Sequence, residues 1–354
     1  MPNEQKVLFV AYDAGPSAAL QKVVDVMGEK AHSFLLNAGK VPEPDEATLR
    51  EAVARCDVVV SGLSSEKSAG FELRALALAV ELGKKIVFFS DTFGAFHRAW
   101  FADYRSHVAL VTTVVEAEVE AAQALFPNAR VITTGNPAWE EFHTPYTRSN
   151  QEKFWRLIDA RRTDRLILIS GCKDRELNLE MVTGVLQDAE DVSAGNDYQV
   201  VLSLHPGDQT HVDEYWAVWQ KAILDLGKFV ILTRDQMPGD VAVGGADVVV
   251  TYNAASVAMR AVAHGQPVMV FQSPRAKARQ LAESGLEINP LLPEAAIGVG
   301  HHGETNFASA LLLAYYWKYD NPISNKPRID QAKFFPSVLP GTYTNALIEA
   351  IKSL

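Results

Sequence analysis

Two carboxylates in the first half of the chain stand where acid–base chemistry is often carried out, directly after an apolar strand candidate. Asp13 follows the run Lys6–Tyr12, and Asp91 follows Lys85–Ser90. A carboxylate at the end of a buried strand can act as a general base and take a proton from a hydroxyl group. Asp13 could instead cap the helix that begins beside it, so Asp13 and Asp91 remain rival candidates for the base.

The loops around these carboxylates carry groups that suit a substrate rich in hydroxyl groups. Glycine permits a tight turn, serine and glutamate offer hydrogen bonds, and a basic pair comes with aromatic side chains that can stack on a sugar ring. The residues expected to contact such an acceptor are Gly15, Ser64, Glu66, His97 and Arg98. Three strands that each end in a polar, glycine-bearing loop form a more specific signal than any one of these loops.

The second half of the chain carries groups that suit a phosphate. The strand candidate Asp247–Thr251 runs into Asn253, Ala255 and Ser256, where a helix begins. The free N–H groups and the dipole of a helix N-terminus attract anions, although Asn253 or Ser256 could simply cap the helix. His205 ends another strand, where it could bind a diphosphate, act as a general acid or serve only as a structural histidine at a turn.

Three further loops of the second half complete the candidate site. Gly171 and Lys173 follow the strand candidate Arg165–Ser170, where the glycine permits close approach and the lysine could reach a phosphate or a sugar. Met237 is expected to cover a nucleobase, and Arg275 is a further cation for the diphosphate. Because the loop that begins at Gly171 matches neither GxGxxG nor a Walker loop, a dehydrogenase and a P-loop enzyme are not supported.

Apolar strand candidates alternate with amphipathic helices from one end of the chain to the other. This pattern predicts an α/β protein with two Rossmann-like parallel-sheet domains, and 354 residues are enough for both. We place the boundary at about residue 140, read residues 289–303 as a loop, and expect helices over 306–318 and 343–354. Because the ligand loops of parallel sheets follow the carboxyl ends of the strands, we expect the site in a cleft between the two domains.

Composition excludes several classes of protein. The chain has 33 Lys and Arg against 43 Asp and Glu, and this net charge of −10 argues against nucleic acid as a partner. Only Cys56 and Cys172 are present, and His301-His302 lacks acidic or Cys partners at ligand spacing, so we expect no metal site. Because the chain has neither a membrane-length apolar run nor a signal peptide, we expect a cytoplasmic protein without a membrane span. A homodimer is left open.

The layout resembles the GT-B glycosyltransferase superfamily, which includes the UDP-N-acetylglucosamine 2-epimerases. The resemblance rests on the two Rossmann-like halves, on Val131–Pro137 between them, on the pair His205-Pro206, and on Thr251–Ser256 leading to Gly265–Phe271. It extends to bacterial enzymes with a His-Pro motif that make surface polysaccharides, including sialyltransferase-like and CDP-glycerol glycerophosphotransferase-like proteins. In those relatives the His and a later Ser or Thr bind the nucleotide's phosphate, and His205 and Ser256 are the matching positions.

The resemblance implies an acceptor domain over residues 1–140, a donor domain over 141–340, and a last helix over 341–354 that packs back on the first domain. It further implies a metal-independent glycosyltransferase that takes a nucleotide-sugar as donor and needs no cofactor. UDP-sugar members commonly place a Glu in the phosphate-binding helix, where this chain has Met259 and Arg260. The alternatives are a nucleotide-sugar 2-epimerase or hydrolase of the same fold, and a non-catalytic two-domain ligand-binding protein.

Overall fold

The computed structural model divides the chain into two compact units. It describes residues 5–160, 165–193, 198–205, 208, 212–222, 229–253, 256–284, 298–300, 309, 329–336 and 338–354. The first unit contains Met1–Glu141 and Val338–Leu354, and the second contains most of the residues between them.

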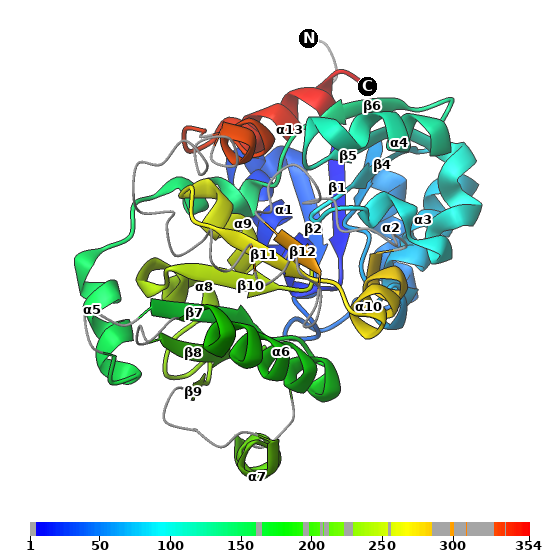
Figure 1. Cartoon of the computed structure of the whole chain (residues 1–354). Coiled ribbons are helices and arrows are strands. Elements are labelled where there is room, and N and C mark those ends of the chain that lie inside the picture. The colour runs from blue at the N-terminus through cyan, green and yellow to red at the C-terminus, as the bar shows by residue number, and fades with distance from the viewer. Residues whose placement is uncertain are drawn as a thin grey trace. The chain divides into compact units, whose positions relative to one another are not determined.

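The first unit is built on a six-stranded parallel sheet, shown in blue to green in Figure 1. In spatial order the strands are β2 (Ala31–Leu35), β1 (Val7–Ala11), β3 (Val58–Ser61), β4 (Lys85–Phe89), β5 (Val108–Thr113) and β6 (Arg130–Thr133). The valine run of β3 is buried on both faces, because Val59 packs into one core while Val58 and Val60 pack into the other. This two-sided burial explains why the strand reads as a continuous apolar run.

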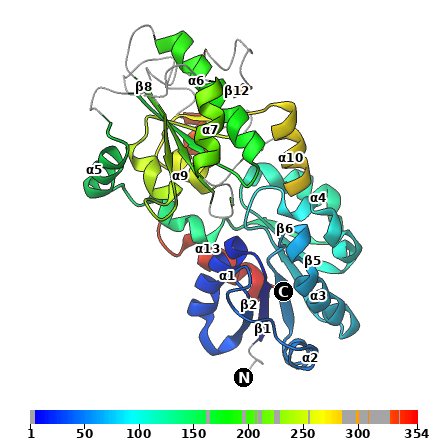
Figure 2. The same ribbon diagram turned by 90° about the horizontal axis from the view of Figure 1, so that it is seen from below.

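Helices cover both faces of this sheet. One face packs against α2 (Glu46–Arg55), α3 (Gly70–Glu81) and α4 (Val119–Leu125), whose apolar residues share a core with Leu8, Val10 and Val59. The other face packs against α1 (Ala14–Met27) and α13 (Thr342–Lys352), which lie side by side in Figure 2. The C-terminal helix is therefore part of the first unit.

The second unit has its own six-stranded parallel sheet. Its strands are, in spatial order, β12 (Gly298–Gly300), β11 (Val268–Phe271), β10 (Val248–Thr251), β7 (Arg165–Ser170), β8 (Tyr198–Ser203) and β9 (Phe229–Leu232). Its described α-helices are α5 (Arg148–Leu157), α6 (Arg175–Ser193), α7 (Val212–Ala222), α8 (Gly239–Ala242), α9 (Ser256–Ala263) and the larger part of α10 (Pro274–Ser284). Buried residues of α6 pack with β7, β8, β10 and β11 in one core.

The α/β class with two Rossmann-like parallel sheets is confirmed. The prediction of a loop over residues 289–303 is wrong in part, since β12 lies within it and pairs with β11. The glycines of β12 carry no apolar pattern, so nothing in the sequence marked it as a strand. The helix expected over 306–318 lies outside the described residues except for Ser309. Among the described helices, none is long and apolar enough to cross a membrane.

Candidate functional site

Asp13 follows β1 and stands at the N-cap position of α1, yet its side chain does not cap that helix. Its Oδ2 instead accepts the backbone N–H of Ser65 at 2.7 Å, from the loop that follows β3. The carboxylate is half-buried and tied to a neighbouring strand end. Helix capping therefore does not explain why an acid stands at position 13.

Ser64 was expected to touch an acceptor, but it is fully buried and does not face solvent. Its Oγ accepts the backbone N–H groups of Tyr12 at 3.1 Å and of Asp13 at 2.8 Å. Its own N–H donates to both carboxyl oxygens of Glu72, at 3.2 and 3.1 Å. Ser64 therefore supports the site from the protein interior, whereas Glu66, in the 3₁₀ turn that follows, is exposed, as is the adjacent Lys67.

Asp91 follows β4 and is only 9% exposed. An ideal Cβ at Gly15 would lie 2.6 Å from Asp91 Oδ2, so a glycine at position 15 makes room for this carboxyl at the start of α1. The Oδ1 atom is buried and has no hydrogen-bond partner among the described residues. Burial raises the pKa of Asp91 to about 6, with Arg98 acting to lower it and Asp13 to raise it.

The basic pair expected near the acceptor is placed beside these acids. Arg98 is 9% exposed, carries its guanidinium 6.0 Å from the ring centre of Trp100, and acts electrostatically on both Asp91 and Glu72. His97 is half-buried, and burial together with Arg105 lowers the pKa of its imidazole. Arg98 therefore offsets part of the negative charge of the acids at this edge of the first sheet.

In the second unit, Gly171 directly follows β7 and donates its N–H to the carbonyl oxygen of Ser203 at 2.9 Å. An ideal Cβ at Gly171 would lie only 2.7 Å from that same oxygen, so the close packing of β7 on β8 already requires glycine. Lys173, two residues further on, is exposed at the start of the loop to α6. Its ammonium group therefore stands in solvent at the carboxyl edge of the sheet.

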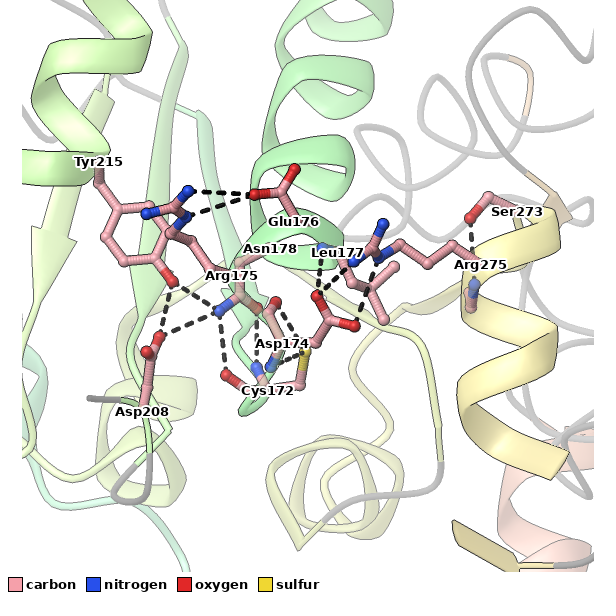
Figure 3. A network of polar contacts seen from close by, with 11 residues as sticks. Cys172, Asp174, Arg175, Glu176, Leu177, Asn178, Asp208, Tyr215, Ser273 and Arg275 are labelled. Carbon is pink, nitrogen blue, oxygen red and sulfur yellow. Dashed lines mark hydrogen bonds and ion pairs between the residues drawn. The ribbon is translucent and has the colours of Figure 1, made fainter. Parts of the chain in front are cut away.

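Asn178 of α6 holds this loop together, as Figure 3 shows. Its Oδ1 accepts the N–H of Cys172 at 2.8 Å, and its Nδ2 donates to the carbonyl oxygen of Cys172 at 3.0 Å. The same Nδ2 lies 2.9 Å from the hydroxyl of Tyr215 and 3.2 Å from Asp208 Oδ2, while Tyr215 donates to Asp208 at 2.6 Å. Asn178 thereby ties the loop after β7 to the loop after β8.

Arg275 is paired with an acid of the same loop. Its Nε and Nη2 donate to Asp174 at 3.3 and 3.2 Å, and Asp174 also accepts the N–H of Leu177 at the start of α6 (Figure 3). These hydrogen bonds hold the pKa of Asp174 below its usual range in spite of partial burial. A phosphate bound by Arg275 must therefore compete with Asp174 for the guanidinium.

The remaining donor-site candidates lie at or near strand ends. His205 follows β8, is half-buried, and accepts the N–H of Asp208 on its carbonyl oxygen at 2.9 Å. Ser256 is the exposed first residue of α9, Asn253 is half-buried just after β10, and Ala255 lies outside the described residues. Met237 is 1% exposed, so its burial in the second unit does not fit the expected lid over a base.

Within the described residues, no group of three His, Cys, Asp or Glu side chains is arranged to hold a metal ion. The pair His301-His302 lies outside these residues.

Sequence reasoning missed two residues of these clusters, Glu72 and Asn178. Glu72 shares the helical spacing of the buried residues Ala75, Leu76 and Ala79, so an acid on the apolar stripe of α3 was the available signal. Asn178 shares the helical spacing of the buried residues Met181, Val182 and Val185 of α6 in the same way. A polar residue on a buried stripe requires partners in the fold, which the sequence alone does not identify.

No family model and no curated protein matches the chain. Solved structures match its fold over nearly the whole length. Anabaena Alr3699/HepE in complex with UDP and glucose has a TM-score of 0.62 at 14% identity, covering 99% of this chain and 100% of that one. A glycosyltransferase from Rickettsia africae has a TM-score of 0.62 at 13% identity, covering 99% and 98%. UDP-GlcNAc 2-epimerase from Neisseria meningitidis bound to UDP-GlcNAc has a TM-score of 0.60 at 10% identity, covering 99% and 100%.

Proposed function

We propose that this chain, which has the GT-B fold, is a glycosyltransferase that moves a sugar from a nucleotide-sugar to a hydroxyl acceptor. The observation that carries the proposal is the buried carboxyl of Asp91, which has a raised pKa and lies beside Asp13 and Arg98 at the carboxyl edge of the first sheet. Such a group can take a proton from an acceptor hydroxyl. The proposed reaction requires neither a metal ion nor a cofactor.

Asp91 suits the role of base better than Asp13. A base works best when its pKa lies near the working pH, and burial raises the pKa of Asp91 to about 6. Its Oδ1 has no partner among the described residues, whereas Asp13 already accepts the N–H of Ser65. In the proposed mechanism Asp13 binds the acceptor and supports Asp91.

The donor is proposed to bind the second unit, with its diphosphate at the start of α9 beside Ser256 and with His205 offsetting charge on the leaving group. Lys173, which is exposed, supplies a further cation. Arg260 is not available for this purpose, because it pairs with Asp240 at 3.3 Å and lies over the ring of Tyr146.

In the proposed transfer the acceptor oxygen displaces the nucleotide from the anomeric carbon of the sugar. Asp91 accepts the hydroxyl proton, the acceptor oxygen forms a bond to the anomeric carbon, and the bond between that carbon and the phosphate oxygen breaks. The nucleotide leaves with the bonding electron pair. The dipole of α9 and the His205 imidazole stabilise the charge that it gains.

The test is a panel of UDP-, CMP-, CDP-, GDP- and dTDP-linked sugars, screened by thermal shift and then for transfer to hydroxyl acceptors. We expect one nucleotide class to raise Tm and to release its nucleotide only when an acceptor is present. Stabilisation by none of them would contradict the proposal. Conversion of the donor without any acceptor would identify a 2-epimerase or hydrolase, and binding of free sugar alone would identify a ligand-binding protein.

A further inference from the structure

Glu72 is a fully buried acid that the proposed chemistry does not use directly. It lies on α3 with none of its surface exposed, and its carboxyl accepts the N–H of Ser64 and the hydroxyl of Ser61, the latter at 3.4 Å. Burying a carboxyl costs free energy unless it is hydrogen-bonded, and here the partners of Glu72 belong to a loop. The segment that it holds is the loop Gly62–Ser65, which follows β3.

This loop is fixed from several directions. The indole N–H of Trp100 donates to the Ser64 carbonyl at 3.0 Å. An ideal Cβ at Gly62 would lie 2.7 Å from Cβ of Pro16, so the loop passes directly against the start of α1. Leu63 adopts a φ of 55°, a left-handed conformation that a leucine keeps only where its surroundings enforce it. These contacts therefore hold the loop in one conformation.

The held loop in turn places Asp13. Ser64 Oγ accepts the N–H groups of Tyr12 and Asp13, which fixes the backbone of Asp13. The Ser65 N–H donates to Asp13 Oδ2 at 2.7 Å, which fixes the carboxylate. A chain of hydrogen bonds thus runs from Glu72 through the loop to Asp13, whose charge acts on the proposed base Asp91.

We propose that Glu72 is a positioning residue which, by fixing the loop Gly62–Ser65, orients the Asp13 carboxylate that acts on Asp91. The proposal rests on the proposed function for its kinetic consequence only. The charged groups that act on Glu72 are Asp13, from the loop after β1, and Arg98, from the segment after β4. Burial first, and Asp13 in addition, raise the pKa of Glu72 to about 8, so it is protonated at neutral pH and adds no negative charge there.

A double-mutant cycle tests the link to Asp13. We expect Glu72→Ala to lower kcat about 30-fold at pH 7, while donor affinity, which depends on the second unit, changes less than about twofold. The double variant Glu72→Ala with Asp13→Asn should be no slower than the slower of the two single variants. Losses that multiply in the double variant would overturn the proposal.

A conservative replacement separates positioning from simple loss of folding. In Glu72→Gln the amide oxygen can still accept from Ser64, so we expect kcat within about threefold of the unmodified chain. We expect the activity of the unmodified chain to decline above about pH 8, as Glu72 ionises beside Asp13, and this decline to be absent in Glu72→Gln. A Gln variant as slow as Glu72→Ala, or one that keeps the alkaline decline, would count against the assignment.

Glu140 offers a matched control. It is also buried and accepts two backbone N–H groups, those of Gly341 at 2.9 Å and Thr344 at 2.8 Å, at the start of α13. We expect Glu140→Ala to lower Tm without non-additive coupling to Asp13→Asn. Equal coupling in this control would show that the Glu72 effect is general destabilisation.

A measurement without substrate distinguishes this proposal from the proposed function. The carboxyl ¹³C signal of Asp13, assigned by its loss in Asp13→Asn, should move in Glu72→Ala and stay in place in Glu140→Ala. If no nucleotide-sugar binds the chain but the signal moves, the proposed function fails and the positioning role stands. An unmoved signal would overturn the positioning role whatever the activity.

Discussion

At the scale of single residues, Asp91 and Asp13 are two acids in different surroundings. Asp91 is buried, and one of its oxygens has no hydrogen-bond partner in the part of the chain that the structure describes, while Asp13 accepts a backbone N–H and remains partly exposed. Their different surroundings suit different tasks, since the group that loses hydration becomes the better base at neutral pH. The two acids should therefore respond differently to the same replacement.

Replacing Asp91 by Asn should remove the base. We expect kcat to fall about 10²- to 10⁴-fold, with donor affinity unchanged. In the unmodified chain kcat/KM should rise as the pH passes about 6, because only the ionised Asp91 accepts a proton. In Asp13→Asn this rise should move to lower pH, since the Asp13 charge raises the pKa of Asp91.

The control for both replacements is Asp25→Asn, which changes an exposed acid of α1 that bonds only locally to Gln21. Its pH–rate profile should match that of the unmodified chain. An Asp91→Asn variant with near-normal kcat would eliminate Asp91 as the base and return that role to Asp13.

Sequence reasoning located these acids because each follows an apolar run, but it misplaced the role of Ser64. A serine in a polar loop reads as a surface residue, whereas its burial depends on Glu72, Trp100 and the backbone of Asp13 closing around it. Those partners come from three separate segments. Because these segments meet only in the folded sheet, no local sequence pattern reveals that Ser64 is buried.

At the scale of elements, strand ends in the second unit are joined by side chains of α6. Asn178 is fully buried and bonds both to the backbone of Cys172 and to Asp208, beside the candidate His205. The sequence predicted strands β7 and β8 from their apolar runs. It did not predict that a single amide fixes the two loops that follow them.

Asn178→Ala should loosen both loops at once. Buried partners left without hydrogen bonds cost about 1–3 kcal/mol each, so we expect a lower Tm and about a tenfold weaker stabilisation by the nucleotide donor. Thermal shift with and without donor measures both effects. The control Asn345→Ala, at an exposed position of α13, should change neither, and unchanged donor affinity in Asn178→Ala would show that these loops do not shape the donor site.

The helix α13 is a second element whose contribution can be measured. Leu347 and Ile351 are fully buried against the first sheet and α1, so replacing either by Ala should destabilise the first unit by about 2–5 kcal/mol. We expect Tm to fall by several degrees, whereas Glu349→Ala, on the exposed side of the helix, should leave it nearly unchanged. Equal Tm values for Leu347→Ala and the control would show that α13 adds little.

At the scale of the whole molecule, three buried carboxyls make the folded chain less stable as the pH rises. Burial raises the pKa of Glu72 to about 8, of Glu118 to about 7 and of Asp91 to about 6. Each binds its proton more tightly in the folded than in the unfolded chain. Their contribution to stability is therefore complete below the unfolded pKa and is lost as the pH rises through the folded pKa.

We expect Tm to fall by about 5 °C between pH 6.5 and 8, where the folded chain still holds protons on Glu72 and, up to about pH 7, on Glu118 that the unfolded chain has released. Three half-buried histidines have lowered pKa values and destabilise the folded chain as the pH falls, namely His97, His143 and His264. Their effect belongs to a lower pH range than this window. Calorimetry at constant ionic strength measures the slope. The slope should be shallower in Glu72→Gln, and a Tm that is flat or rising would refute these protonation states.

The position of α13 has a consequence for synthesis of the chain. The first unit is encoded mainly by Met1–Glu141, yet one face of its sheet is covered by a helix from Val338–Leu354. A ribosome must therefore make the whole second unit before the first can bury that face. Until then Val7, Phe9 and Val60 lack part of their cover, so the unit synthesised first is the last to be completed.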